Sequence, residues 1–127
     1  HRHMSISERL KQMQSDQDKY PLTLPGLDEN NNDLVVYFTK LTVKEDEKLR
    51  KKHPAFYKSM TDGDIPSFSA MVDLIILKCK DEDGNAIFAQ ADSMYLANQD
   101  VGYITAIATG MLEKLFDIPT VETIEGN

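Results

Sequence analysis

One stretch of the chain, residues 68–79, is apolar around nearly its whole circumference when it is drawn as a helix. Five of its residues follow the three- and four-residue spacing of a buried stripe: Phe68, Met71, Val72, Ile75 and Cys79. Leu74, Ile76 and Leu77 widen that stripe to almost every side of the helix. Such a helix has to be covered on more than one side, so we expect it either in the middle of a core or in an oligomer contact.

The flanking sequence predicts an α+β fold that is mainly α-helical and has a small N-terminal β-hairpin. Tyr20–Leu24 alternates weakly between apolar and polar residues, and Leu34–Phe38 is rich in β-branched and aromatic residues. The turn signal Pro25-Gly26 and a polar loop separate these two segments. We therefore expect them to pair as a hairpin with a long, mobile tip.

Capping signals place further helices on both sides of the hairpin. Ser5 with Glu8, and Thr42 with Glu45, have the spacing of capping boxes, and Asp100 can cap the last helix. Together with the apolar spacing, they predict helices over four segments, at about 6–15, 43–53, 68–79 and 101–116. We also expect a short strand-like piece at residues 86–88 and then a polar bridge.

The chain has 127 residues, of which 41% are apolar, and this predicts one domain with loose ends. Residues 1–19 comprise a tag-like remnant before Met4 and an N-terminal arm that is either docked or frayed. Residues 20–117 form the single globular domain, and 118–127 are expected to be a flexible tail. No apolar run approaches the length of about 20 residues that a membrane span needs, so no membrane partner is expected.

The net charge of −7 is unevenly distributed. Through Lys58 the chain has 11 basic and 9 acidic residues, and beyond it 3 basic and 12 acidic ones. This asymmetry indicates either two solvated faces or head-to-tail self-association. An acidic protein repels phosphate backbones, so we interpret the basic run Lys48–Lys52 as a solvated helix face and expect no nucleic-acid partner.

No motif in the sequence carries a catalytic or cofactor signature, so we expect no enzyme activity, no cofactor and no metal ion. Asp81-x-Asp83 is similar to part of a calcium loop, but Gly84 follows at once and no Glu occupies the twelfth position. A hairpin-like turn is the simpler interpretation. His53 is interpreted as a helix-end residue without an identifiable carboxylate partner. Cys79 is either a thiol of lowered pKa between two lysines or, more commonly, a small buried hydrophobe.

The order of these segments resembles the tail assembly chaperones of long-tailed, siphovirus-type bacteriophages. The resemblance covers about residues 20–116 and depends on these pieces in sequence: Thr23-Leu24-Pro25-Gly26, Leu41-Thr42, Val43-Lys44-Glu45, the apolar helix, Asp81-Glu82-Asp83-Gly84-Asn85-Ala86-Ile87-Phe88, Asp92 and the closing apolar helix. The acidic turn and the phenylalanine after it are its sharpest element.

The resemblance implies a function in viral morphogenesis. Such a chaperone binds and solubilises the helical tape measure protein before tail tube subunits polymerise around it. It implies a homo-oligomer, possible association with a longer frameshifted form, and residence in the host bacterial cytoplasm rather than in the mature virion. The alternative is a structural tail or connector subunit that forms a ring in the virion.

A coating chaperone needs exposed apolar surface for its client and negative charge to keep the assembly in solution. Six residues are candidates for this interaction surface, with ordinary core burial as the alternative for each: Leu74, Leu77, Met94, Tyr95, Leu112 and Phe116.

Overall fold

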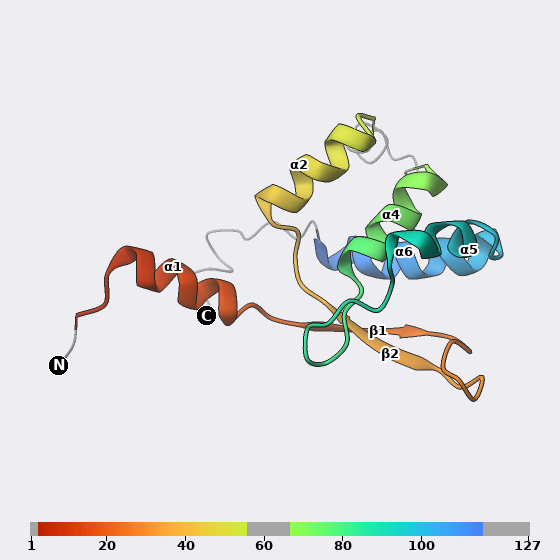
Figure 1. Cartoon of the computed structure of the whole chain (residues 1–127), viewed down its shortest axis with the longest axis horizontal. Helices are drawn as coiled ribbons and strands as arrows, with labels where there is room; N and C mark the ends of the chain where they lie inside the picture. Colours follow the sequence, from red (N-terminus) through yellow and green to blue (C-terminus); the bar gives the residue numbers. More distant parts are fainter. Residues whose placement is uncertain (1–2, 56–66, 116–127) are drawn as a thin grey trace.

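The computed structural model describes residues 3–55 and 67–115 (Figure 1). In these ranges the chain forms, in order, α1 (Ile6–Ser15), β1 (Tyr20–Leu24), β2 (Leu34–Phe38), α2 (Val43–Lys52), α4 (Phe68–Lys78), the 3₁₀ turn η1 (Gln90–Asp92), α5 (Ser93–Ala97) and α6 (Val101–Leu115). The predicted α+β class is confirmed, since helices predominate and the strands form one two-stranded antiparallel hairpin.

The hairpin has the strand boundaries that the sequence predicts. Tyr20 pairs with Phe38 at its open end, and Leu24 pairs with Leu34 beside the tip. Because side chains alternate between the two faces of a strand, Leu24, Val36 and Phe38 all point into the core. Within the tip, the Asp28 carboxylate accepts hydrogen bonds from the amides of Asn30 and Asn32, so the polar loop is shaped by its own side chain.

α4 lies in the middle of the core, which is the first of the two positions expected from its sequence, the other being an oligomer contact. It contacts α2 on one side and α5 and α6 on others, while the hairpin packs against α6 (Figure 1). Six of its eleven residues are buried: Ala70, Met71, Val72, Leu74, Ile75 and Lys78. Most of its apolar circumference is thus covered within one chain.

The helix ends follow the capping signals. At α2, the Thr42 hydroxyl accepts from the Glu45 amide and the Glu45 carboxylate accepts from the Thr42 amide, which completes the predicted capping box. At α6, the Asp100 carboxylate accepts from the amide of Tyr103. The stripe that α6 buries is the predicted one: Ile104, Ile107, Ala108, Met111 and Leu115. Gly110 lets β1 approach, because a Cβ there would lie 2.9 Å from Leu22 Cδ1.

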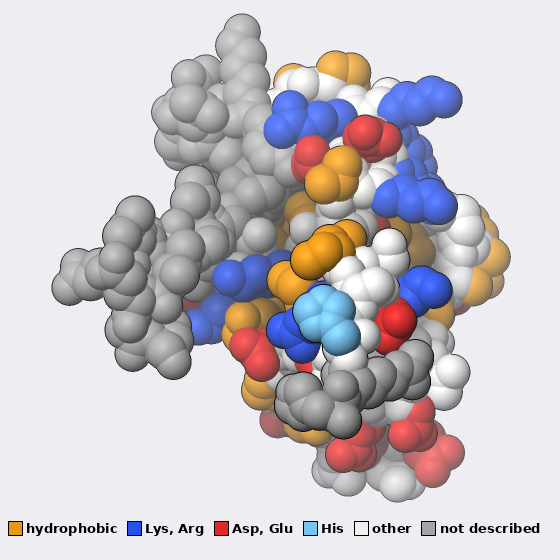
Figure 2. Space-filling model, turned by 90° about the vertical axis from the view of Figure 1, so that its left-hand side faces the viewer, with side chains coloured by type: hydrophobic (Ala, Val, Ile, Leu, Met, Phe, Trp, Pro, Cys, Tyr) orange, Lys and Arg blue, Asp and Glu red, His pale blue; other side chains and the backbone are white. Residues whose placement is uncertain are grey.

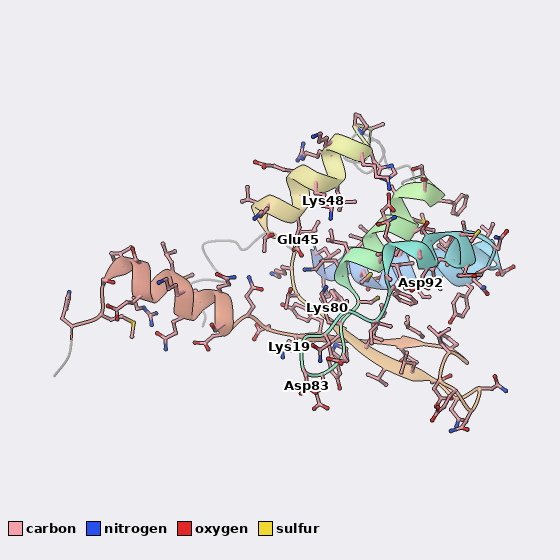
Figure 3. The ribbon with its side chains drawn as sticks, viewed as in Figure 1. Lys19, Glu45, Lys48, Lys80, Asp83 and Asp92 are labelled. Carbon is pink, nitrogen blue, oxygen red and sulfur yellow. The ribbon has the colours of Figure 1, made fainter. Side chains whose placement is uncertain are left out.

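The acidic segment after α4 is a tight turn, as predicted. Asp81 Oδ1 accepts from the amides of Asp83 and Asn85, and Gly84 adopts a positive φ of 89° that favours glycine. The hydrogen bond from the Asn85 amide is the largest of several that lower the pKa of Asp81. Lys80 pairs with Tyr37 of β2, and Figure 3 shows Lys19, Lys80 and Asp83 near the open end of the hairpin.

Three sequence expectations differ from the structure or fall outside it. The strand expected at residues 86–88 is reduced to a single bridge between Ala86 and Lys80. Phe68 was expected in the buried stripe but is 50% exposed, because it lies in the first turn of α4, where that helix leaves the core. The C-terminal tail, 118–127, lies outside the described residues.

α1 is a formed helix without a buried residue. The Ser5 hydroxyl caps it by accepting from the amide of Glu8. It extends away from the rest of the molecule at the open end of the hairpin (Figure 1). Of the two states that the sequence allows for the arm, docked or frayed, the structure has neither, since the helix is intact and undocked.

Candidate functional site

The exposed apolar residues Met94 and Tyr95 lie on α5, in a segment that we expected to be a polar bridge. Their side chains are 59% and 63% exposed, whereas Leu96 beside them is buried and anchors the helix to the core. Exposed apolar side chains on a helix this short have no role in packing the chain's own core. These two predicted interaction residues are therefore accessible to a partner.

Polar side chains hold this five-residue helix in place. Before it, Asp92 Oδ2 accepts from the amide of Ala89 at 2.8 Å. After it, the side-chain amides of Asn98 and Gln99 donate to the carbonyls of Met94 and Tyr95, two of the last carbonyls of α5. A helix of five residues does not form alone, so these contacts and the buried Leu96 fix the position of the exposed pair.

The two candidates on α4 are not part of an exposed surface. Leu74 is 0% exposed, and the expectation that it faces a partner is wrong, because α2, α5 and α6 surround the helix. Leu77 is partly buried and packs against the core, while also lining a small cavity with His53 and Gln90. The outer side of α4 is thus used for intramolecular packing.

The two candidates nearest the C-terminus have different outcomes. Leu112 is partly buried and packs against the core, so it offers only part of its side chain to a partner. Phe116 lies outside the described residues. Among the five predicted surface residues that lie within 3–55 and 67–115, Met94 and Tyr95 are the two that are more than half exposed.

A groove flanks α5 on the side of α4 and the start of α6, and we call it the helix groove. It has a volume of about 290 Å³. Its apolar lining comes from three helices: Phe68, Val72, Leu96, Ala97, Val101 and Ile104. Phe68 and Val101 are half exposed or more, so the groove has apolar side chains at its rim as well as along its lining.

A second groove lies on the other side of α5, and we call it the tip groove. It has a volume of about 460 Å³, and its apolar lining includes Leu27, Leu34, Phe88, Tyr95, Tyr103 and Ile107. The Tyr103 hydroxyl donates to the carbonyl of Pro25 at 2.8 Å, which ties the tip of the hairpin to α6. Because Leu96 and Gln99 line both grooves, α5 is the ridge between them.

The tip groove is acidic. Asp92 is the charged residue in its lining, and the neighbouring hairpin tip adds Asp28, Glu29 and Asp33. Burial raises the pKa of the Tyr103 phenol, and the negative charge of Asp33 raises it further. Basic groups on a partner would complement this charge.

We call Met94, Tyr95 and the two flanking grooves the α5 surface. It differs from the other described exposed apolar residues, such as Val35 and Val43, which lie on the hairpin and at the start of α2. Convergence of exposed apolar side chains on two adjacent grooves is typical of a binding site rather than of scattered surface residues.

An ion pair that joins the end of α4 to the start of α2 was not anticipated from the sequence. Lys78 is 2% exposed, and its Nζ donates to Glu45 Oε1 at 2.9 Å and Thr39 Oγ1 at 3.0 Å. The carbonyl of Lys40 accepts a third, longer hydrogen bond from it. Glu45, labelled in Figure 3, thus caps the start of α2 and also pairs with the charge of Lys78 at the end of α4.

A second polar cluster joins α2 to α4. His53 Nε2 lies 2.6 Å from Asp73 Oδ2, and Lys52 Nζ lies 3.0 Å from the same oxygen. Burial alone would raise the pKa of Asp73, but hydrogen bonds from His53 and Lys52 offset it and lower the pKa overall. His53 ends α2 as predicted, but the expectation that it has no identifiable carboxylate partner is replaced by this contact.

These groups do not assemble a metal or thiol site in the described ranges. Cys79 is fully buried, and burial raises its pKa to about 12, so it is the small hydrophobe of the two interpretations. No cluster of three His, Cys, Asp or Glu residues within 3–55 and 67–115 is placed to hold a metal ion. Among the helices of those same ranges, none has the length and apolarity to cross a membrane.

Comparisons of the chain with protein-family models, curated proteins and solved structures find no match.

Proposed function

We propose that this protein is a tail assembly chaperone of long-tailed bacteriophages that binds the tape measure protein and keeps it in solution before the tail tube polymerises. The observation that carries the proposal is the α5 surface, an exposed apolar ridge with a groove on each side. The order of sequence segments, which resembles this family, suggests the client, and the α5 surface offers a means of binding it.

The chemistry of the surface suits a helical, aggregation-prone client. A client helix presents apolar side chains at three- and four-residue spacing, and such a stripe can lie along a ridge flanked by grooves. The net charge of −7 would keep a coated rod in solution through mutual repulsion of the bound copies. Binding of this kind needs neither a cofactor nor catalysis, so we propose a binding protein rather than an enzyme.

Co-expression with the client tests the proposal. The client is the product of the long, helix-rich reading frame that we expect next to this gene. We expect that protein to be insoluble when expressed alone, and to become soluble and co-purify when this protein is present. Client solubility that is the same with and without this protein would remove the chaperone function.

The fate of the protein separates the chaperone from the alternative, a ring-forming tail or connector subunit. A chaperone leaves before the particle is complete, so we expect purified virions to lack it. Its presence at fixed stoichiometry in virions, detected by mass spectrometry, would favour the structural subunit.

A further inference from the structure

The arm helix α1 has an apolar stripe that nothing in its own chain covers. Ile6, Leu10 and Met13 follow a spacing of four and three residues, and they are 77%, 60% and 60% exposed. Figure 2 looks onto the end of the molecule that carries α1 and shows hydrophobic side chains open to view between charged ones. Isolated helices of ten residues are marginal in water, so α1 needs a partner surface to be stable.

The tip groove of the same chain cannot take the whole stripe. α1 leaves the hairpin at its open end, opposite the tip (Figure 1), and Lys19 is tied there by a hydrogen bond to the Glu82 carbonyl. The five residues of β1 separate that end from the tip by about 17 Å. If α1 folded back along the hairpin, its Met13 end would remain beside the open end and only its Ile6 end would approach the tip.

The charges of α1 and the tip groove are complementary. Arg9 and Lys11 give α1 a net charge of +1, because Glu8 is its one acidic residue. The groove and the adjoining hairpin tip carry acidic residues without a basic one among the residues that line the groove: Asp28, Glu29, Asp33 and Asp92. A second copy therefore offers α1 both an apolar groove and a favourable electrostatic field.

We infer that α1 of one copy docks into the tip groove of a second copy, with Ile6, Leu10 and Met13 against the apolar lining and Arg9, which borders this stripe, toward the acidic tip. This assigns a structural basis to the self-association that the sequence predicts. The inference concerns contacts between copies of this chain and is tested without the client, but the tip groove is also part of the α5 surface that we propose for the client.

Disulfide trapping tests the docking with a matched control. We expect the double variant Met13→Cys, Leu27→Cys to form a covalent species of twice the chain mass or larger under mild oxidation, seen on non-reducing gels. In the control, Ser15→Cys with Leu27→Cys, the first cysteine lies on the opposite side of α1 and should give no more product than the single variants. Native Cys79 is buried and does not compete.

Three results of the disulfide experiment would overturn the inference. A disulfide within one chain would show that the arm folds onto its own hairpin, and it would overturn the inference. Equal yields from the Met13→Cys and Ser15→Cys pairs, or no product above the single variants, would also overturn it.

Sedimentation of the uncross-linked chain provides a second measurement. We expect Leu10→Asp to raise the dissociation constant of self-association about tenfold or more, because it removes a large apolar contact. Added salt should weaken association further, as screening shortens to about 3 Å at molar ionic strength. The control Gln12→Asp places the same charge away from the stripe and should have a smaller effect. A wild-type chain that remains monomeric at high concentration in low salt would contradict the inference.

Discussion

α4 and α5 are in contact and both are rich in apolar residues, yet they use these residues in opposite ways. α4 lies between three helices, and its leucine at position 74 is entirely inaccessible. α5 contacts the core through Leu96 and turns Met94 and Tyr95 outward. The difference teaches that apolar content does not identify an interaction surface in this chain. What identifies it is whether neighbouring elements already cover the side chain.

Substitution in the middle of α4 should have the largest effect. Leu74→Asp places a carboxylate where no water reaches and removes a fully buried leucine, which together should cost about 4 kcal/mol or more of folding free energy. Since small domains are stable by about 5–15 kcal/mol, this loss is a large part of the total, and we expect the urea midpoint of unfolding to fall strongly. Urea denaturation followed by circular dichroism measures it. A stability within 1 kcal/mol of the wild type would show that α4 is less enclosed than described.

The buried lysine at the end of α4 should come second. Lys78→Met removes the partner of Glu45 and leaves the Thr39 hydroxyl and the Lys40 carbonyl without this donor. Because Glu45 is partly exposed and still caps α2, we expect a loss of about 1–3 kcal/mol rather than the larger cost of a fully buried charge. Lys44→Met, on the exposed side of α2, is the matched control and should change stability by less than about 0.5 kcal/mol.

Asp73→Asn probes the outer side of α4 with a smaller effect, which depends on pH. The pKa of Asp73 is lower in the folded protein than in the unfolded chain, so its ionised form favours folding. That contribution is complete well above about pH 3.9, the unfolded value, and disappears as the pH falls through the lowered folded pKa. We expect the variant to lose about 1 kcal/mol at neutral pH.

Urea unfolding of both proteins from pH 7 to pH 2.5 checks this linkage. The difference between wild type and Asp73→Asn should shrink as the solution becomes acidic. A difference that stays constant over this range would mean that the carboxylate does not gain stability from His53 and Lys52.

Local sequence signals predicted the regular elements well. Both strands and the capped starts of α1, α2 and α6 lie where alternation and capping residues place them. α5 was missed because five residues are too few to show a helical period. Its position depends instead on hydrogen bonds made by flanking side chains. Asp92 accepts from the amide of Ala89 before the helix, and Gln99 donates to the carbonyl of Tyr95 within it.

The polar contacts were missed for a different reason. Lys78 lies 33 residues from Glu45, and Asp73 lies 20 residues from His53, so no local spacing reveals either pair. A lysine and an aspartate inside a strongly apolar helix were nevertheless a usable signal, because a buried charge needs a partner. The grooves could not be predicted, since they arise where elements far apart in the chain meet.

The smallest effect on stability, and the sharpest test of the comparison, is expected on α5. Tyr95→Asp replaces a side chain that is 63% exposed, so folding free energy should change by no more than about 0.5 kcal/mol. If α5 binds the client, however, the change places a charge in an apolar contact, and capture of the tape measure protein should fall about tenfold or more. Val43→Asp, at an exposed valine on the start of α2, controls for added charge and should leave capture unchanged. Equal capture by both variants would mean that α5 is exposed without being a binding surface.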